Sequence, residues 1–216
     1  TAYISSGSYL WVMDISTESS PRLISETKLE NYINYIRRIG NYLYVSKNDT
    51  LLNIYDIHTD TLPVLVSEFV GPTTLSPWND MTIYGDTLLI SKGYGREFLI
   101  NDTVNLTYVR NIGLDDQLRK RDTIAIGCDD NYIDVYKVKG TTSVTSPTDY
   151  FYDADENLRG LYLTYPYVYF GYGSKGIGIM DISNLYDIKL NKTVTTDGYT
   201  YDVEMIEETL LIAARG

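Results

Sequence analysis

Residues 167–184 read Tyr-Val-Tyr-Phe-Gly-Tyr-Gly-Ser-Lys-Gly-Ile-Gly-Ile-Met-Asp-Ile-Ser-Asn, and both halves of this stretch recur along the chain. The first half is an alternating segment of the Y-V-Y-V type, and it has five further copies, which start at Thr1, Tyr42, Thr87, Thr123 and Thr209. With the copy at Tyr167 included, successive starts are 41, 45, 36, 44 and 42 residues apart. The second half is an apolar segment whose last position holds Asp14, Asp56, Asn101, Lys137 and Asp181. Two signals with one period predict a repeated supersecondary unit.

Each unit is expected to contain four short strands. Two-residue turns precede the alternating segments, at Gly40-Asn41, Gly85-Asp86, Arg121-Asp122, Tyr165-Pro166 and Glu207-Glu208, and such turns join hairpin strands. Four strands in about 40 to 45 residues are typical of a propeller blade. The sequence therefore predicts an all-β fold, a β-propeller of four-stranded antiparallel blades with about five blades.

We expect one propeller domain over residues 1–216, with repeats at about 1–33, 34–79, 80–116, 117–158 and 159–200 and a terminal hairpin at 201–216. Residues 203–214 are rich in good helix formers. The segment nevertheless aligns with five copies that have strand patterns, so we expect strands there.

The stretch at 167–184 resembles the LVIVD-type repeat of secreted and surface propellers, whose units read approximately Y-V-Y-V-A-x-G-x-x-G-L-x-I-x-D-I-S-N-P. The copies at residues 2–16 and 42–58 match less fully, and those around Thr87 and Thr123 lack the Asp-Ile-Ser ending. Leu185 stands where the family often has Pro. The resemblance implies a blade and an extracellular setting, but it specifies no activity.

The strand count leaves one strand unassigned. We name the strands of a blade A to D from the propeller axis outward, and count 21 strands in the pattern, whereas a closed five-bladed propeller has 20. The strand at 201–206 would complete the first blade by pairing with residues 3–5. The surplus strand contains Thr209, Leu210, Leu211, Ile212 and Ala213.

Two interpretations of the surplus strand stay open. In the first, the 216 residues are a portion of a longer propeller. In the second, the strand adds to an exposed sheet edge of a neighbouring subunit through main-chain hydrogen bonds. A head-to-tail contact of this kind propagates as a filament.

Composition excludes several classes of function. The net charge of −11 repels phosphate backbones and anionic lipid, which disfavours nucleic-acid and membrane-surface binding. With one Cys and one His, the chain has no disulfide framework and no thiolate or imidazole metal cluster. No apolar run approaches the ~20 residues of a membrane-spanning helix, so no membrane insertion is expected.

The remaining candidate side chains have structural interpretations. His58 follows Asp56 at a strand turn, and Cys128 has no second thiol or nearby His, so we expect a turn residue and a buried thiol. Asp14 and Asp181 are expected to accept main-chain hydrogen bonds in the turns after the third strands. No catalytic residue is predicted.

In a propeller, the D-to-A and B-to-C loops share one face, and here these loops are acidic and aromatic. The candidate ligand residues are Trp78, Asp80, Asp115, Asp153, Asp155, Asn157 and Tyr199. Solvated loops are the ordinary explanation, and a site for a sugar, a cation or a basic partner is the functional one. Asp153-x-Asp155-x-Asn157 begins like a calcium loop, but Leu158 and Thr164 occupy positions that need Gly and Glu. No cofactor is therefore predicted, with calcium as the weak exception.

Four N-x-Thr sequons start at Asn48, Asn101, Asn105 and Asn191 and suit a glycosylated surface protein. We expect a non-catalytic extracellular or cell-surface module that binds other copies or other surface proteins. One alternative is a propeller that binds a sugar or cation on its acidic face. The other is a hydrolase or lyase, which requires two converging carboxylates.

Overall fold

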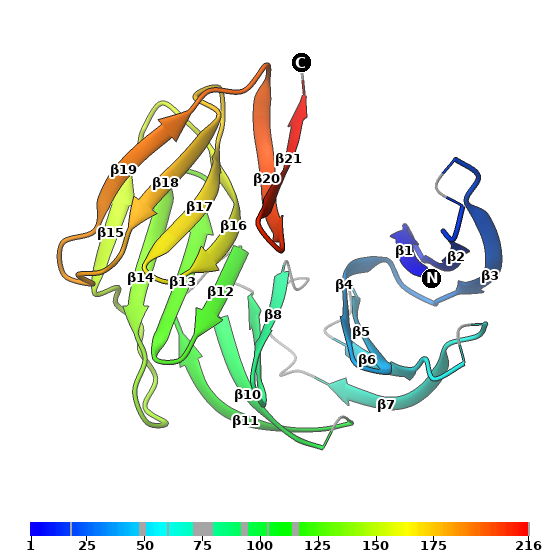
Figure 1. Ribbon diagram of the computed structural model, residues 1–216. Coiled ribbons are helices and arrows are strands. Elements are labelled where there is room, and N and C mark those ends of the chain that lie inside the picture. The colour runs from blue at the N-terminus through cyan, green and yellow to red at the C-terminus, as the bar shows by residue number, and fades with distance from the viewer. Residues whose placement is uncertain are drawn as a thin grey trace. The chain divides into compact units, whose positions relative to one another are not determined.

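The protein is all-β. The computed structural model describes residues 1–17, 19–47, 51–59, 61–70, 80–91, 95–102, 104–113 and 117–215, with only the backbone of residues 51 and 70. These residues form the 21 strands expected from the repeat pattern and no helix (Figure 1). The described part of the chain accordingly holds no helix that is long and apolar enough to cross a membrane.

The strands form antiparallel sheets in chain order. The first sheet has three strands: β1 (Ala2–Ser6), β2 (Tyr9–Asp14) and β3 (Arg22–Lys28). Two four-stranded sheets follow: β4 (Ile33–Ile39), β5 (Tyr42–Lys47), β6 (Leu51–Asp56) and β7 (Val64–Val70), then β8 (Asp80–Tyr84), β9 (Thr87–Ser91), β10 (Gly95–Asp102) and β11 (Asn105–Ile112). Two more are β12 (Gln117–Arg121), β13 (Ile124–Asp129), β14 (Tyr132–Lys137) and β15 (Asp149–Tyr152), then β16 (Leu158–Thr164), β17 (Tyr167–Tyr172), β18 (Ile177–Asp181) and β19 (Lys189–Val194). The last sheet pairs β20 (Tyr199–Ile206) with β21 (Thr209–Arg215).

The chain divides into two compact units. Unit 1 contains residues 1–81 and 99–107, and unit 2 contains residues 82–98 and 108–216. The expected pairing of residues 201–206 with residues 3–5 would join the two units and stays a prediction, as does a single propeller domain.

Tight turns join the first two strands of each sheet, as the sequence predicts. Gly40 and Gly85 have φ values of 54° and 60°, in the left-handed region that only Gly adopts without a steric cost. Asp122 and Glu207 take similar values, 50° and 55°, in the corresponding turns of unit 2. The β20–β21 hairpin confirms that residues 203–214 form strands, because tertiary context overrides helix propensity.

The core of unit 2 lies between consecutive sheets. Alternate residues of β13 and β14, such as Ile126 and Val135, pack against Val168, Phe170 and Met180 of the next sheet, and all five are fully buried. β20 contacts β16 and β17. The period-2 pattern of the sequence therefore becomes a layered core.

Unit 1 is built in the same way from its first two sheets. Leu10 of β2 packs with Leu43, Val45 and Tyr55 of β5 and β6, and Ile57 closes the cluster. All five side chains are buried.

Three sheets share an irregularity between their last two strands. The register shifts between Val12 and Met13, between Ile54 and Tyr55, and between Ile179 and Met180. Each shift lies one or two residues before the Asp of the repeat. A β-bulge at a constant position of a repeat is a designed feature of the blade.

Candidate functional site

Asp14 and Asp181 hold turns, as predicted. The Ser16 amide donates a hydrogen bond to Asp14 Oδ1 at 2.9 Å, and the Ser183 amide donates to Asp181 Oδ1 at 2.8 Å. Hydrogen bonds from the Ser16 side chain and amide lower the pKa of Asp14, and hydrogen bonds from the Ser183 amide and side chain lower the pKa of Asp181. Their role is structural.

His58 and Cys128 also lie where the sequence places them. The His58 amide donates to Asp56 Oδ1 at 2.8 Å, and His58 Nδ1 lies 2.6 Å from the same oxygen. Cys128 is buried, and its thiol donates to the Leu158 carbonyl at 2.8 Å.

The predicted acidic loop after β15 contains a hydrogen-bonded ion pair. Asp153 Oδ2 accepts hydrogen bonds from Lys175 Nζ at 2.5 Å and from the Tyr172 hydroxyl. Lys175 Nζ also lies 4.8 Å from the centre of the Tyr172 ring. The side chains of Asp153, Lys175 and Tyr172 therefore connect this loop to β17 and to the β17–β18 connection.

The pKa values of these groups follow from their contacts. Hydrogen bonds from Lys175 and Tyr172 lower the pKa of Asp153 to about 2. Burial, followed by the hydrogen bond to Asp153, raises the pKa of Tyr172, and the hydrogen bond to Asp153 raises the pKa of Lys175. All three groups therefore keep their ordinary charge at neutral pH.

The rest of the loop is held by its backbone. Glu156 is buried, and its carboxylate accepts hydrogen bonds from the amide of Ser174, at 2.8 Å, and from its hydroxyl. Asn131 donates to the carbonyls of Asp153 and Glu156 at 3.0 and 2.8 Å. Asp155 contributes an amide, which donates to Asp153 Oδ1 at 3.0 Å.

This arrangement offers little to a calcium ion. An oxygen of Asp153 already bonds a lysine, and the Asp155 and Asn157 residues are exposed. Among the described residues, no three His, Cys, Asp or Glu side chains are grouped as a metal site requires.

The other predicted ligand residues do not join this cluster. Asp80 is buried and its Oδ1 accepts a hydrogen bond from the Met81 amide at 2.8 Å, within unit 1. The Tyr199 ring lies 4.8 Å from the Tyr201 ring on β20. Trp78 and Asp115 lie outside the described residues.

A pocket of about 380 Å³ at this end of unit 2 joins residues that the sequence reasoning did not select. Its lining includes Asp129, Tyr132, Asp134, Tyr150 and Cys128. Tyr132 faces Asp129 across the β13–β14 ladder, and Asp134 faces Tyr150 across the β14–β15 ladder. The signal was present as Tyr-x-Asp at 132–134 and Tyr-x-Tyr at 150–152, because residues two apart share a face of a strand.

The tyrosines of this pocket form an exposed aromatic surface. The Tyr132 ring stacks on the Tyr152 ring at 4.6 Å and lies 6.1 Å from the Tyr150 ring, and all three side chains are 43% to 57% exposed. The Tyr136 hydroxyl donates to Asp134 Oδ2 at 3.3 Å. Aromatic faces beside carboxylates suit a cationic or amphipathic ligand.

The predicted assembly strand is an exposed edge. Among the described strands, β20 is the one hydrogen-bonded neighbour of β21. Leu211 and Ile212 are 48% and 42% exposed, and Ala213 is exposed as well. Apolar side chains on a strand with an unpaired edge are a template for a further strand.

Three of the four sequons can be located. Asn101 and Asn105 are exposed, but their amides donate to Thr107 Oγ1 at 2.6 Å and to Asp102 Oδ2 at 2.7 Å. Asn191 is exposed and lies opposite the register shift between β18 and β19. The side-chain amide of Asn191 donates no hydrogen bond to any described residue. Asn48 lies outside the described residues.

Comparisons with known proteins agree with this architecture. The family model of the LVIVD repeat matches residues 2–28, 36–70 and 163–196. These are the repeats that keep the Asp of the turn and the bulge before it. No curated protein matches the chain.

Solved structures show the same fold at low sequence identity. A chain in the crystal structure of the mitotic checkpoint complex has a TM-score of 0.73 at 11% identity, over 98% of this chain and 68% of that one. BamB from Moraxella catarrhalis has a TM-score of 0.67 at 13% identity, over 98% and 62%. The computationally designed protein Ika8 has a TM-score of 0.66 at 12% identity, over 99% and 67%.

The chain thus spans about two thirds of the length of the propellers that it resembles. At such identities the likeness concerns the fold. With its four-stranded antiparallel sheets, the chain is similar to β-propellers in fold, and three of its segments match the LVIVD repeat.

Proposed function

We propose that this protein is a non-catalytic interaction module that acts outside the cell and assembles through β21. The observation that carries the proposal is the exposed edge of β21, with Leu211, Ile212 and Ala213 along it. The repeat family and the propeller neighbours support an interaction role. Self-assembly, the extracellular location and the lack of catalysis are the parts of this proposal that go beyond an interaction role.

The occupant of the β21 edge is a strand from a second copy. An exposed edge presents a row of unpaired N–H and C=O groups, and strand addition converts them into main-chain hydrogen bonds. β1 is a suitable acceptor, because it has one hydrogen-bonded neighbour in a three-stranded sheet and Ile4 is 43% exposed. Pairing of β21 with β1 of the next copy is head-to-tail and therefore gives a filament.

Two variants test this assembly by electron microscopy and light scattering of the purified full chain. Deletion of residues 209–216 removes the donor strand, and L211K with I212K places charges on both faces of it. We expect filaments from the wild type and folded monomers from both variants. Thr193→Lys, on exposed β19, is the matched control and should assemble normally.

Either of two results would overturn the proposal. Filaments that persist without residues 209–216 exclude β21 as the donor. A wild-type chain that stays monomeric under all assembly conditions excludes self-association. Circular dichroism of each variant separates loss of assembly from loss of fold.

The extracellular location has its own test. Asn191 is the sequon whose exposed amide has no described partner, so it is the favoured glycan acceptor. Mass spectrometry of native material should show a glycan on the peptide that contains Asn191. Bare Asn191, Asn105 and Asn101 peptides from native material would contradict an extracellular glycoprotein.

The tyrosine and aspartate pocket favours a second function, the binding of an organic cation. Asp129, Asp134, Tyr132 and Tyr150 line one 380 Å³ pocket in a protein of net charge −11. A cation gains from both the carboxylates and the ring faces. A sugar is the alternative ligand for an acidic and aromatic surface, and it is tested beside the cation.

Calorimetry with tetramethylammonium chloride tests this second function, with methyl β-D-glucoside as the sugar arm. Tyr132→Ala should abolish the heat of tetramethylammonium binding, whereas Tyr186→Ala, at an exposed tyrosine outside this pocket, should leave it unchanged. Binding of the glucoside alone would favour the sugar alternative. The absence of any heat in the wild type would remove this function.

A further inference from the structure

A second and larger pocket lies at the opposite ends of the strands in unit 2. Its volume is about 460 Å³, within the range of ligand sites. The β12–β13 turn, the end of β14 and the β16–β17 and β18–β19 turns supply its lining. None of the site residues predicted from the sequence lines it. No residue of β21 lines it either.

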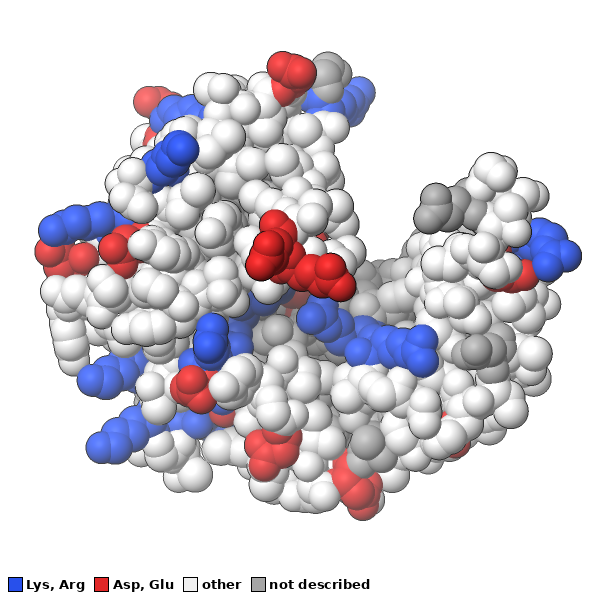
Figure 2. All heavy atoms as spheres, viewed as in Figure 1, with Lys and Arg blue, Asp and Glu red and all other residues white. Residues whose placement is uncertain are grey.

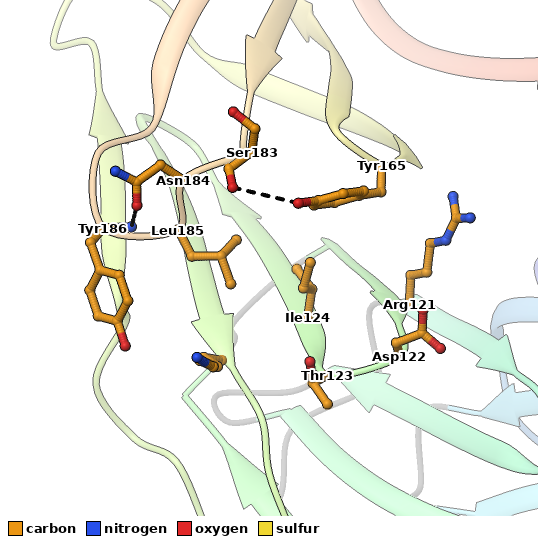
Figure 3. Close-up of a pocket in the computed structure, with 10 residues that line it drawn as sticks. Arg121, Asp122, Thr123, Ile124, Tyr165, Ser183, Asn184, Leu185 and Tyr186 are labelled. Atoms are coloured by element: carbon orange, nitrogen blue, oxygen red, sulfur yellow. Dashed lines mark hydrogen bonds between the residues drawn. The ribbon is translucent and has the colours of Figure 1, made fainter.

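The floor of this pocket is apolar. Ile124 and Leu185 both pack on the core between the two sheets, and their side chains lie next to each other in Figure 3. Tyr165 and Tyr186 flank them, with the Tyr165 hydroxyl 3.5 Å from the Ser183 carbonyl, to which it donates. A branched apolar group would fit between these side chains.

The rim of the pocket is basic in an acidic protein. Arg121 and Lys137 both line it, and in Figure 2 basic side chains gather around the ends of β12 and β14. Lys137 Nζ lies 5.9 Å from the centre of the Tyr186 ring. Among the residues that the structure describes, no carboxylate lies within ion-pair distance of Arg121 or Lys137. The pocket therefore gathers two basic side chains in a protein with 29 acidic residues against 18 basic ones.

Asp122 is the one acidic residue of the lining. Its Oδ1 accepts a hydrogen bond from the Tyr84 hydroxyl at 2.8 Å. Ser183 and Asn184 add polar groups to the lining. Because two cations stand against this one carboxylate, the local charge is positive and attracts an anion.

We propose that this pocket binds a carboxylate attached to a branched apolar group. Arg121 and Lys137 bind the carboxylate, and Ile124 and Leu185 contact the apolar part. Two sources have this chemistry: a free organic acid, and the carboxyl terminus of a partner chain that ends in an aliphatic residue. The inference concerns a site separate from the proposed assembly strand, so either can fail alone.

Titration calorimetry of the full chain with N-acetyl-L-leucine tests the proposal, and N-acetyl-L-leucinamide is the matched ligand without the charge. We expect the acid to bind and the amide to bind at least about tenfold more weakly, since hydrogen bonds to charged groups contribute that much. A peptide that ends in leucine, with a free or an amidated terminus, forms the second arm. Tighter binding of the free peptide than of acetyl-leucine assigns the site to chain termini, and the reverse assigns it to free acids.

Lys137→Gln and Arg121→Gln should each weaken acetyl-leucine binding about tenfold, because each removes one charged partner of the carboxylate. Lys192→Gln, at an exposed lysine of β19 outside the pocket, is the matched control and should have no effect. Equal binding of acid and amide, or variants that bind like the wild type, would overturn the proposal. If Arg121→Gln alters the melting temperature, the exposed Lys137→Gln variant decides the result.

Discussion

Three aspartates hold the same turn in three repeats. The carboxylates of Asp14, Asp56 and Asp181 each accept a hydrogen bond from the amide two residues later, at 2.8 to 2.9 Å. Asp and Asn favour this turn because their side chains reach their own backbone. Hydrogen bonds from the side chain and the amide of the residue two positions later lower the pKa of all three carboxyl groups.

The Asp181 carboxylate should make the stability of the fold depend on pH. Because its pKa is lower in the folded chain than in the unfolded one, where it is about 4, its contribution to stability is present above pH 4 and is lost as the pH falls through the folded value. Asp181→Asn keeps the turn without titrating, so its free energy of unfolding should fall less on acidification than that of the wild type. Asp181→Ala should be less stable than both at pH 7.

Urea unfolding of these three proteins between pH 7 and pH 3 measures the effect. An acid-induced loss of stability in Asp181→Asn as large as in the wild type would contradict the role given to this carboxylate.

Gly178 shows why β18 contains a glycine in the middle of a strand. A Cβ atom at this position would overlap the Phe170 ring, which is fully buried. We expect Gly178→Ala to destabilise the fold by about 1 to 3 kcal/mol through overpacking. Thr193→Ala, directly opposite on β19, is exposed and should change stability by less than about 0.5 kcal/mol. Thermal unfolding of both variants decides this prediction, and a neutral Gly178→Ala would refute it.

At the scale of elements, β10, β11 and β12 share a buried ionic cluster. The Glu97 carboxylate accepts a hydrogen bond from Arg110 Nε and lies 3.4 Å from Lys120 Nζ, and the three side chains are 4% to 8% exposed. Charges buried in this way stabilise little as a group, but the removal of one partner leaves the others uncompensated.

Glu97→Gln should therefore lower the free energy of unfolding by about 3 to 5 kcal/mol. Asp187→Asn breaks an exposed pair with Lys189, at 2.8 Å, and should cost about 0 to 1 kcal/mol. Denaturant unfolding of the two variants at neutral pH compares them. Similar losses in both would show that burial of the cluster has no energetic consequence.

At the scale of the whole molecule, the net charge of −11 opposes the compact state. Salt screens this repulsion, so the melting temperature should rise when NaCl is raised from about 20 mM to about 200 mM. Calorimetric melting at the two concentrations measures the shift. A lower melting temperature in the higher salt would mean that local ion pairs, such as Asp153 with Lys175, outweigh the overall repulsion.

The sequence alone was sufficient to place the strands of this protein. The recurrence of an alternating segment and of an Asp-terminated segment with one period placed the strands, turns and C-terminal hairpin, because residue period and turn chemistry are local properties of the chain. The role of Asp14 and Asp181 followed for the same reason. The acidic loop around Asp153 was also found, but not that Lys175 and Tyr172 occupy it.

Only the tertiary structure decided which side chains share a site. Asp129 and Tyr150 meet through strand register, and Arg121, Lys137 and Leu185 come together because two sheets pack face to face. These contacts join residues up to 64 positions apart, from Arg121 to Leu185. The sequence pattern indicates on which face of a strand a side chain lies. A pocket also depends on which sheet faces pack together and on how the strands are aligned along their length, and both are set by tertiary packing.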